Sequence, residues 1–424
     1  MSSSAARRRE VFRNGDFRRF WAAITVAGVG AHVTVLALPL TAVTLLGADA
    51  AQLGMLTAAH LVPTLFMTPI AGVVSDRYSP RLVNALCDIV RGVLLLGVPL
   101  LATLDVLSLG PLYVLSALTG CLAALGDVAH HSMLPQIVPQ QQIVAGNAAV
   151  NASYSVTDVV GPGLAGLLVQ TLTAPYAILM DAVGFLVSGG LIASLKTRTA
   201  ERPPVREQWR VMVVDGFRFV LRSKPLLMLG VSGGVANLFI QAYLTIFVLY
   251  AAGTLDFSPL QIGLLYAVGA VGGVGGAAVS DRLGTVVTRV GAMTAGIVLV
   301  GVGMVLVAAS AVFAAGLTRG AVCVVGIGLY SAGLGIYNVH SMSARQQMCP
   351  PEKLGRVTAG YRLLSHGSLP LGSLVGGFSA QWFGQGRTIV LAGGCLVLWM
   401  GLVWLTPLRR LNDPLDREAS PAVV

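Results

Sequence analysis

Val74-Ser75-Asp76-Arg77 and Val279-Ser280-Asp281-Arg282 are two copies of one tetrapeptide, and each copy lies where a long apolar stretch stops. About half of the chain separates them. A charged tetrapeptide at the end of an apolar stretch, repeated after half a chain length, indicates two copies of one membrane-embedded unit. The repeat therefore predicts a fold of two related bundles of membrane-spanning helices.

The composition supports this prediction. The chain has 424 residues, of which 55% are hydrophobic and 11% are charged, and its mean hydropathy is +0.78. A soluble globular protein carries about 25% charged residues, and a helix needs about 20 apolar residues to cross a bilayer. Twelve stretches meet that length and are expected to be helices: 18–46, 52–75, 82–104, 108–130, 148–171, 174–195, 226–252, 259–280, 286–313, 319–342, 358–382 and 387–408.

The placement of the positive charge fits twelve spans. The formal net charge is +10, which would also suit a nucleic-acid partner. With twelve spans, however, all of the 28 basic residues except Arg91, Arg319, Arg362 and Arg387 fall on one side of the membrane. Loops rich in Lys and Arg stay on the cytoplasmic side. We therefore expect both termini in the cytoplasm and no nucleic-acid partner.

The predicted domains follow from the same pattern. We expect an N-terminal six-helix bundle over 1–195 with a cytoplasmic tail, a C-terminal six-helix bundle over 225–408, and a cytoplasmic tail over 409–424. Between the bundles, 196–224 is a basic linker. Its Trp209–Leu221 part fits either an amphipathic helix on the membrane surface or a solvated tether.

The repeat extends beyond the tetrapeptides. At the same offset, His32 matches Asn237, and at a slightly larger offset Gly161 matches Gly372. Both halves hold six spans in the same orientation, so they are parallel repeats. In such designs the substrate site lies between the halves near the membrane midplane.

No pattern of catalytic residues is present. The five cysteines are scattered without a CxxC pair, and no phosphate-binding GxxxxGK[ST] occurs. We expect no enzyme activity, no cofactor, no metal site and no use of ATP by this chain.

The first tetrapeptide belongs to a longer motif. Gly72-Val-Val-Ser-Asp76-Arg77-Tyr-Ser-Pro-Arg81 resembles the G-x-x-x-D-R-x-x-x-R signature that major facilitator superfamily transporters carry after their second span. The second copy keeps Asp281 and Arg282 but has no closing arginine at the expected place. The resemblance implies an all-α membrane fold of twelve transmembrane helices in two pseudo-symmetric six-helix bundles.

Other stretches in the N-terminal half narrow the resemblance. Leu134-Pro-Gln-Ile-Val-Pro139, Asn147-Ala148, Gly161-Pro162-Gly-Leu-Ala-Gly166 and Asp181-Ala-Val-Gly-Phe185 resemble the drug-exporter branch that includes macrolide efflux proteins and the enterobactin exporter. Gly161, Pro162 and Gly166 also look like the helix-packing motif of the fifth span in antiporters. The branch implies export of a small molecule.

The resemblance assigns a conformational gate to the charged motif. Such a cluster holds one bundle against the other and releases when the bundles rock, and an acid at the end of the fourth span joins it. Glycine permits close helix approach, whereas a carboxylate can meet an arginine or a helix N-terminus. The alternative is that these charges only fix topology. The predicted gate residues are Gly72, Asp76, Arg77, Arg81, Asp127, Asp281 and Arg282.

Ionisable residues inside spans are costly and are therefore functional candidates. Asp158 lies near the middle of the fifth span, and His32 near the middle of the first. Burial disfavours a charged carboxylate, and histidine titrates near neutral pH, so both are candidates for proton coupling. A structural hydrogen bond to a neighbouring helix is the alternative. Asp88 and Arg91, three positions apart, are predicted to form a structural pair.

Three further polar residues are candidates for the substrate cavity. Asn237 and Gln241 share one face of the seventh span, and His366 lies in the eleventh. Polar contacts between helices of one bundle explain them equally well.

Together these features favour secondary active efflux of an apolar or amphipathic small molecule, such as an antibiotic, a siderophore or another secondary metabolite. Proton antiport with alternating access is the expected mechanism. Uptake or facilitated diffusion of a small polar solute is the alternative, and a non-transporting membrane sensor or assembly partner is a remote one. We expect a monomer in a bacterial inner membrane, with small-molecule substrate, protons and membrane lipids as its partners.

Overall fold

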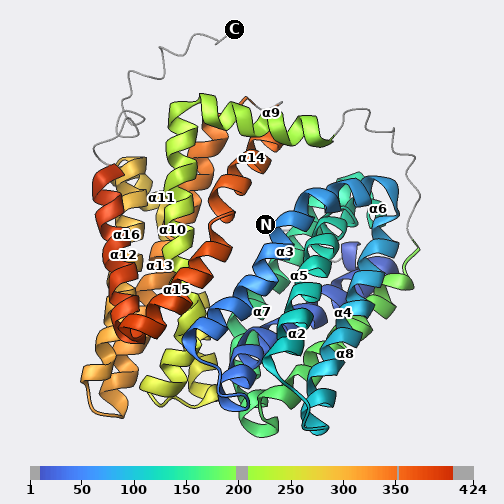
Figure 1. Cartoon of the computed structure of the whole chain (residues 1–424). Coiled ribbons are helices and arrows are strands. Elements are labelled where there is room, and N and C mark those ends of the chain that lie inside the picture. Colours follow the sequence, from blue (N-terminus) through green and yellow to red (C-terminus); the bar gives the residue numbers. More distant parts are fainter. Residues whose placement is uncertain (1–9, 197–208, 351–352, 404–424) are drawn as a thin grey trace. The chain divides into compact units, whose positions relative to one another are not determined.

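The computed structural model describes residues 10–196, 209–350 and 353–403, which form helices joined by short turns (Figure 1). No β-strand occurs in these three ranges. The described chain divides into two compact units. The predicted all-α membrane fold is confirmed for this part of the chain.

Unit 1 comprises Met1–Trp209 together with Phe257–Ala267. Its long helices are joined by turns and by two short helical segments. In chain order its helices are α2 (Gly15–Thr44), α3 (Ala50–Arg77), α4 (Pro80–Thr103), α5 (Leu109–His131), α6 (Leu134–Ile137), the 3₁₀ turn η1 (Gln140–Gln142), α7 (Ile143–Leu172) and α8 (Ala174–Ala193).

Unit 2 comprises Arg210–Asp256 and Val268–Val424. It contains nearly all of the linker helix α9 and most of α11, whose first residues belong to unit 1. In chain order the helices are α9 (Trp209–Arg222), α10 (Lys224–Leu249), the π-helical turn η2 (Tyr250–Thr254), α11 (Pro259–Val286), α12 (Arg289–Ala309), the 3₁₀ turn η3 (Ser310–Val312), α13 (Leu317–Gln347), α14 (Leu354–His366), α15 (Leu369–Phe383) and α16 (Gln385–Val403).

The two units repeat one pattern of helix contacts. In unit 1, α2 packs on α7 and α8, α4 packs on α5 and α8, and α3 packs on α5. In unit 2 the corresponding helices make the same contacts, because α10 packs on α15 and α16, α12 packs on α13 and α16, and α11 packs on α13. The duplication inferred from the tetrapeptides is therefore visible in the packing of each unit.

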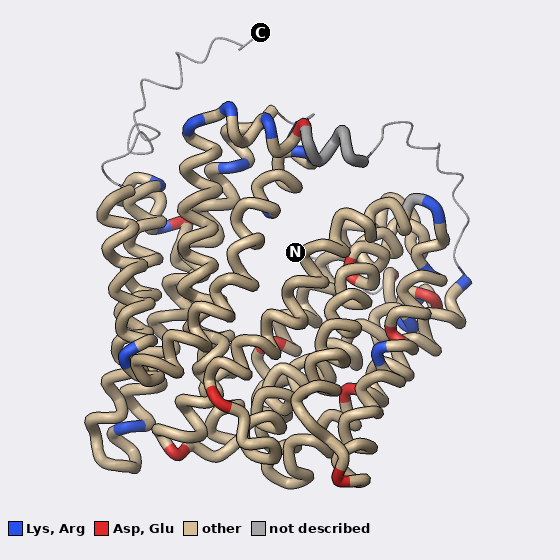
Figure 2. Tube along the Cα trace, in the orientation of Figure 1, with Lys and Arg blue, Asp and Glu red and all other residues tan. Residues whose placement is uncertain are grey.

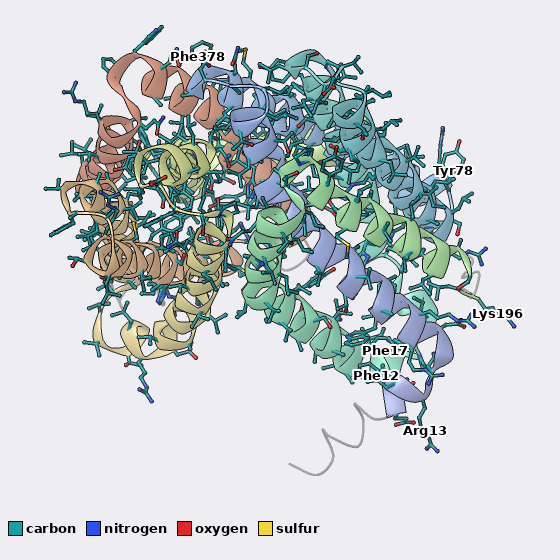
Figure 3. The ribbon with its side chains drawn as sticks, turned by 90° about the horizontal axis from the view of Figure 1, so that it is seen from below. Phe12, Arg13, Phe17, Tyr78, Lys196 and Phe378 are labelled. Atoms are coloured by element: carbon teal, nitrogen blue, oxygen red, sulfur yellow. The ribbon has the colours of Figure 1, made fainter. Side chains whose placement is uncertain are left out.

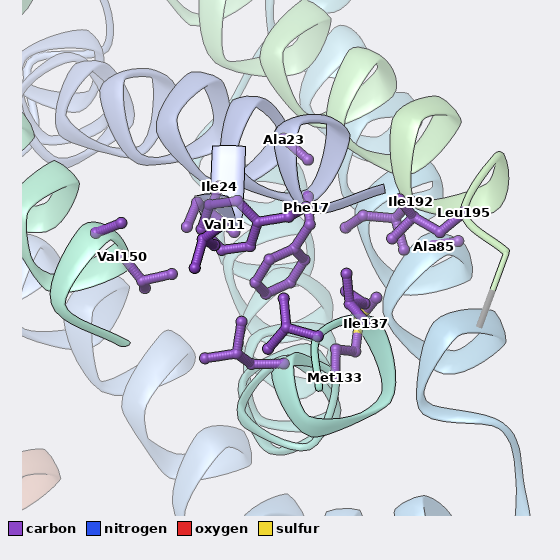
Figure 4. Packing of buried hydrophobic residues seen from close by; sticks show 14 residues of the cluster. Val11, Phe17, Ala23, Ile24, Ala85, Met133, Ile137, Val150, Ile192 and Leu195 are labelled. Carbon is purple, nitrogen blue, oxygen red and sulfur yellow. The ribbon is translucent and has the colours of Figure 1, made fainter. Parts of the chain in front are cut away.

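The start of α2 is fixed by its first residues. Asn14 caps the helix, since its side chain accepts hydrogen bonds from the backbone of Asp16 and Phe17, and its Nδ2 donates to Ile137 O at 3.0 Å. Phe17 is fully buried within a cluster of apolar side chains from several helices (Figure 4). Phe12 meets it edge to face with ring centroids 5.2 Å apart (Figure 3).

Eleven helices in the described part of the chain are long and apolar enough to cross a membrane. The remaining predicted span, 358–382, is the eleventh in chain order, and it is divided between α14 and α15. Pro370 has no backbone N–H, and its ring crowds the carbonyl of His366 one turn earlier. The intervening Gly367 and Ser368 keep right-handed helical dihedral angles. The span is therefore interrupted locally while its backbone stays close to helical.

Few charged residues interrupt the long helices of either unit (Figure 2). Residues 1–9 of the predicted N-terminal tail, 197–208 of the basic linker and the whole predicted C-terminal tail lie outside the described residues. Within the linker, Trp209–Arg222 is a helix, which agrees with the helical option for that segment. Its position at a membrane surface stays a prediction.

Candidate functional site

His32 and Asp158, the two candidates for proton coupling, form one pair in unit 1. His32 Nε2 on α2 lies 3.2 Å from Asp158 Oδ1 on α7. The histidine side chain is 26% exposed and the aspartate side chain 61% exposed. The pair therefore joins two helices of one unit while the carboxylate stays accessible. Either an imidazolium–carboxylate ion pair or a neutral hydrogen bond fits this contact.

Gly161 explains why the pair can form. It lies one turn after Asp158 on α7, and a Cβ built on it would lie 2.6 Å from His32 Cδ2. Any side chain at this position would have to displace the imidazole. The absence of a Cβ lets the ring rest against α7 and reach Asp158.

Pro162 and Gly166 lie at a second close contact of α7. A Cβ on Gly166 would lie 2.5 Å from Pro259 O and 2.9 Å from Leu260 Cα, at the start of α11. Gly263 faces the Pro162 carbonyl there. These α11 residues belong to unit 1, so the predicted packing motif lies where two helix backbones of that unit meet.

The first charged motif is only partly described. The side chain of Asp76 lies outside the described residues. Arg77 is exposed at the end of α3. An Nη1–H group of Arg81 donates to Leu195 O, just after α8, so this arginine ties the start of α4 to the end of α8.

Gly72 and Asp127 complete the first predicted gate. A Cβ on Gly72 would meet no other atom within 4 Å, so the close helix approach predicted for this glycine is not formed in the described structure. Asp127 lies on α5 within electrostatic reach of Arg91, His131 and His60. Its described neighbours are therefore cations and titratable groups rather than Arg81.

The second charged motif is more open. Asp281 and Arg282 are both exposed on α11, and neither has an ion-pair partner among the described residues. Ser280 is buried and donates to Gly276 O at 3.0 Å. Gly284 faces the ring of His340 on α13, because a Cβ there would lie 3.3 Å from His340 Cε1.

Two of the three cavity candidates come together at the interruption in the eleventh span. Asn237 Nδ2 on α10 donates to Ser365 O at 2.8 Å, and His366 Nδ1 lies 3.0 Å from Ser365 Oγ. Gln241 instead donates from Nε2 to Thr245 Oγ1, 3.2 Å away on its own helix. Asn237 and His366 therefore both contact Ser365, whereas the Gln241 side chain contacts Thr245, one turn further along α10.

The predicted structural pair of Asp88 and Arg91 needs correction. Asp88 Oδ2 accepts a hydrogen bond from Ser188 Oγ at 2.7 Å. The Arg91 guanidinium carbon lies 4.0 Å from the centre of the Phe185 ring. Both partners lie on α8, which packs against α4. The two residues stay within electrostatic reach of each other, but they form no direct ion pair.

Several residues that surround these candidates were not predicted as partners. Ser365 and Ser368 lie at the interrupted span, where Ser368 Oγ donates to Gly234 O at 2.7 Å. Phe185 and Ser188 were not singled out as partners for α4, although their spacing from Asp181 places all three on one face of α8. This helical spacing could have identified Phe185 and Ser188 as residues that face the same neighbouring helix as Asp181.

The comparisons with known proteins identify the class. Residues 20–368 match the sequence profile of the Major Facilitator Superfamily. The chain belongs to this superfamily, and it is a multi-pass membrane transporter rather than an enzyme.

Individual relatives agree with this assignment. The chain is 29% identical to an MFS-type transporter of Sinorhizobium fredii, over 80% of this chain and 84% of the relative. It is 26% identical to the multidrug efflux pump Tap of Mycolicibacterium fortuitum, over 92% of this chain and 96% of Tap. A crystal structure of a mutant of the nucleoside transporter NupG superposes with a TM-score of 0.79 at 10% identity, covering 92% of this chain and 99% of that one. This likeness supports the major facilitator fold.

Proposed function

We propose that this transporter exports an apolar or amphipathic small molecule in exchange for protons. The similarity to Tap, a multidrug efflux pump, supports the direction of transport and the class of substrate. The predicted spans also offer few polar groups for binding a sugar-like solute. The placement of basic residues supports a cell membrane location with both termini in the cytoplasm.

The observation that carries the proton step is the contact between His32 and Asp158. An ionised carboxylate facing lipid at this depth would cost several kcal/mol (about 2.5–3.5 on insertion scales). The exposed side of Asp158 is therefore expected to face water or polar groups, from which a proton can reach it. His32 holds the carboxylate from the other side at 3.2 Å.

The protonation state of this pair would set how strongly α2 and α7 are held together. With Asp158 ionised and His32 protonated, opposite charges attract across the helix contact. Protonation of Asp158 removes that attraction and leaves at most a neutral hydrogen bond, which contributes about 0.5–1.5 kcal/mol. Proton binding would therefore loosen one helix contact of unit 1, and a change of this kind can bias an alternating-access equilibrium.

The charged motif after the second span is proposed to act as the gate. Arg81 supports this role through its hydrogen bond to the end of α8. Asp127 and Arg77 lie on α5 and α3, within the same unit. In the second motif Asp281 and Arg282 have no ion-pair partner among the described residues, so the first motif is the stronger candidate.

The test uses inverted membrane vesicles with an imposed pH gradient and a panel of fluorescent drugs. Wild type should accumulate at least one drug, and collapse of the gradient should stop accumulation. Asp158→Asn should lose this pH-driven accumulation but keep exchange of labelled for unlabelled drug, because exchange needs no net proton movement. Asp215→Asn, which changes an exposed acid on α9, is the matched control and should behave as wild type.

Three results would contradict the proposal or the position of its proton site. Accumulation that survives collapse of the pH gradient would exclude proton antiport. Drug entry driven down its own gradient, with no response to pH, would instead favour facilitated diffusion. If coupling is present and Asp158→Asn retains it, the proton site lies elsewhere.

A further inference from the structure

Asp181 is the most deeply buried acid described in unit 1. It lies on α8, and only 1% of its surface is exposed. Its Oδ1 atom has no hydrogen-bond partner. Such an atom is rare, because burying a polar group without a partner costs about 1–3 kcal/mol. The residue belongs neither to the pair of His32 and Asp158 nor to the charged motif, so its environment calls for a separate explanation.

One side of Asp181 faces α4 across a buried polar interface. Asp181, Phe185 and Ser188 lie at helical spacing along α8. Ser188 holds Asp88, and Phe185 lies under the guanidinium of Arg91. Asp181 is therefore the first of three residues on one face of α8, and the other two, Phe185 and Ser188, contact side chains of α4.

The other side of Asp181 faces α2. A Cβ built on Gly30 would lie 2.6 Å from Asp181 Oδ1, so the oxygen rests where α2 has no side chain. Thr34, one turn further along α2, is close enough to interact with Asp181. Its hydroxyl oxygen is nevertheless buried without an aligned hydrogen-bond partner. The described surroundings thus offer Oδ1 no strong donor.

Charge balance decides which acid in this region stays neutral. Arg91 lies within electrostatic reach of Asp88, Asp127 and Asp181. Asp88 and Asp181 are buried, whereas Asp127 is exposed. One guanidinium cannot neutralise the two buried carboxylates where water is largely excluded, and Asp127 competes for the same cation. Asp88 has a hydroxyl donor from Ser188. Asp181 has neither a donor on Oδ1 nor contact with water, so its surroundings favour the protonated form.

The remaining ionisable groups around α8 do not change this balance. On α2 the nearby ionisable residue is His32, which is turned toward Asp158 on α7. Asp127 has the additional neighbours His131 and His60. The cation of this region that acts on Asp181 is therefore Arg91, which Asp181 shares with two other acids.

We propose that Asp181 is a second proton-binding site. It holds its proton while α2 and α8 are packed as in this structure, and it releases that proton to water when the two helices separate. The O–H bond of the carboxylic acid breaks, and the electron pair stays on the carboxylate. Ionised Asp181 then needs donors that closed packing against Gly30 does not provide, so release of the proton and separation of the helices favour each other.

The two proton sites meet on one turn of α2. His32 and Gly30 are two residues apart, so they point about 200° away from each other around the helix axis. His32 contacts α7 through Asp158, and Gly30 contacts α8 through Asp181. A shift of α2 therefore changes the surroundings of both acids together.

The first experiment detects the proton itself. Infrared spectra of the purified full-length protein in lipid nanodiscs should show the carbonyl band of a protonated carboxylic acid at neutral pH. This band should be lost in Asp181→Asn and kept in Asp88→Asn. An unchanged band in Asp181→Asn would overturn the proposal.

A milder variant protects this test against misfolding. Thr34→Val keeps the shape of the side chain but removes the hydroxyl that could stabilise ionised Asp181. The carbonyl band of this variant should persist to higher pH than that of wild type. A band that responds to pH as in wild type would contradict the assignment to Asp181.

A role for the Asp181 proton in transport rests on the proposed antiport. Whether Asp181 carries a proton does not depend on that proposal. If wild-type vesicles show no proton coupling, the antiport proposal fails while the infrared result still decides whether Asp181 is protonated. If coupling is present, Asp181→Asn should lose pH-driven accumulation and keep drug exchange, and Asp181→Glu should restore part of the accumulation. Asparagine mimics a permanently protonated acid, so normal coupling in Asp181→Asn would reduce Asp181 to a structural role.

Discussion

The same position in the repeat carries different chemistry in the two units. In unit 1, His32 on α2 faces Asp158 on α7 with 3.2 Å between Nε2 and Oδ1. In unit 2, Asn237 on α10 donates to Ser365 O on α14 at 2.8 Å. Both contacts join the first predicted membrane span of a unit to its fifth. One is a pair of titratable side chains, and the other is an amide bonded to a backbone carbonyl.

The glycines beside these contacts differ in the same way. In unit 1, Gly161 makes room for the ring of His32, which is a side chain. In unit 2, Gly372 lies against the backbone carbonyl of Leu238 and 3.0 Å from Gln241 Cβ, measured from a Cβ built on the glycine. Duplication therefore preserved the helix contact. Of the two contacts compared, only the one between His32 and Asp158 in unit 1 pairs two titratable side chains.

The largest effect should come from giving unit 1 the residue of unit 2. His32→Asn keeps a polar side chain at the helix contact but removes the titratable ring. We expect pH-driven drug accumulation to fall by about tenfold, within the roughly 5–150-fold range that coupling free energies of 1–3 kcal/mol produce. Drug exchange without a pH gradient should change little. Vesicle assays of drug accumulation with a pH gradient and of drug exchange without one measure this difference.

The reciprocal variant is the control. Asn237→His places a titratable ring in unit 2, where no carboxylate is described beside it. The ratio of its pH-driven drug accumulation to its drug exchange should stay close to that of wild type. An equal loss of pH-driven accumulation in His32→Asn and Asn237→His would mean that the two contacts have equivalent structural roles. The difference between the units would then be unrelated to proton coupling.

The next effect concerns stability. Gly372→Ala forces a methyl group against the backbone of α10, which cannot move without shifting the helix. Overpacking of this kind costs typically about 1–3 kcal/mol. Gly161→Ala meets the His32 ring instead, which can rotate away. We therefore expect a lower unfolding temperature for Gly372→Ala than for Gly161→Ala, measured in detergent by thermal unfolding.

Gly161→Ala should show its main defect elsewhere. Displacement of the His32 ring weakens its contact with Asp158, so pH-driven accumulation should fall while stability is nearly kept. If Gly161→Ala is the less stable variant of the two, the His32 ring is held more rigidly than its contacts indicate.

Much of this architecture follows from the sequence because long apolar stretches have few stable alternatives in a bilayer. The repeat of the tetrapeptides likewise predicts two related bundles. The interruption at Pro370 was missed, since hydropathy does not register a missing backbone hydrogen bond. The superfamily assignment follows from Gly72–Arg81, where motif and position agree.

The site was harder to predict. Asp158 and His32 were both singled out, but their contact depends on how α2 and α7 are rotated, and sequence spacing does not fix the rotation of separate helices. Asp88 and Arg91 show the opposite error. Their spacing allows a pair on one helix face, yet Ser188 and Phe185 on α8 offer better-placed partners.

The smallest effect should come from comparing the arginines of the two charged motifs. Arg81→Leu removes the hydrogen bond to Leu195 O, and a hydrogen bond to a charged group contributes about 1.5–3 kcal/mol. Since Arg81 is partly exposed, solvent lowers this value, and we expect drug exchange to slow several-fold. Arg282→Leu removes an exposed side chain without an ion-pair partner among the described residues, so its exchange rate should stay near wild type. Stopped-flow measurement of drug exchange compares the two. A slower Arg282→Leu variant would show that the second motif also works as a gate, because its side chain would then gain a partner at another stage of the cycle.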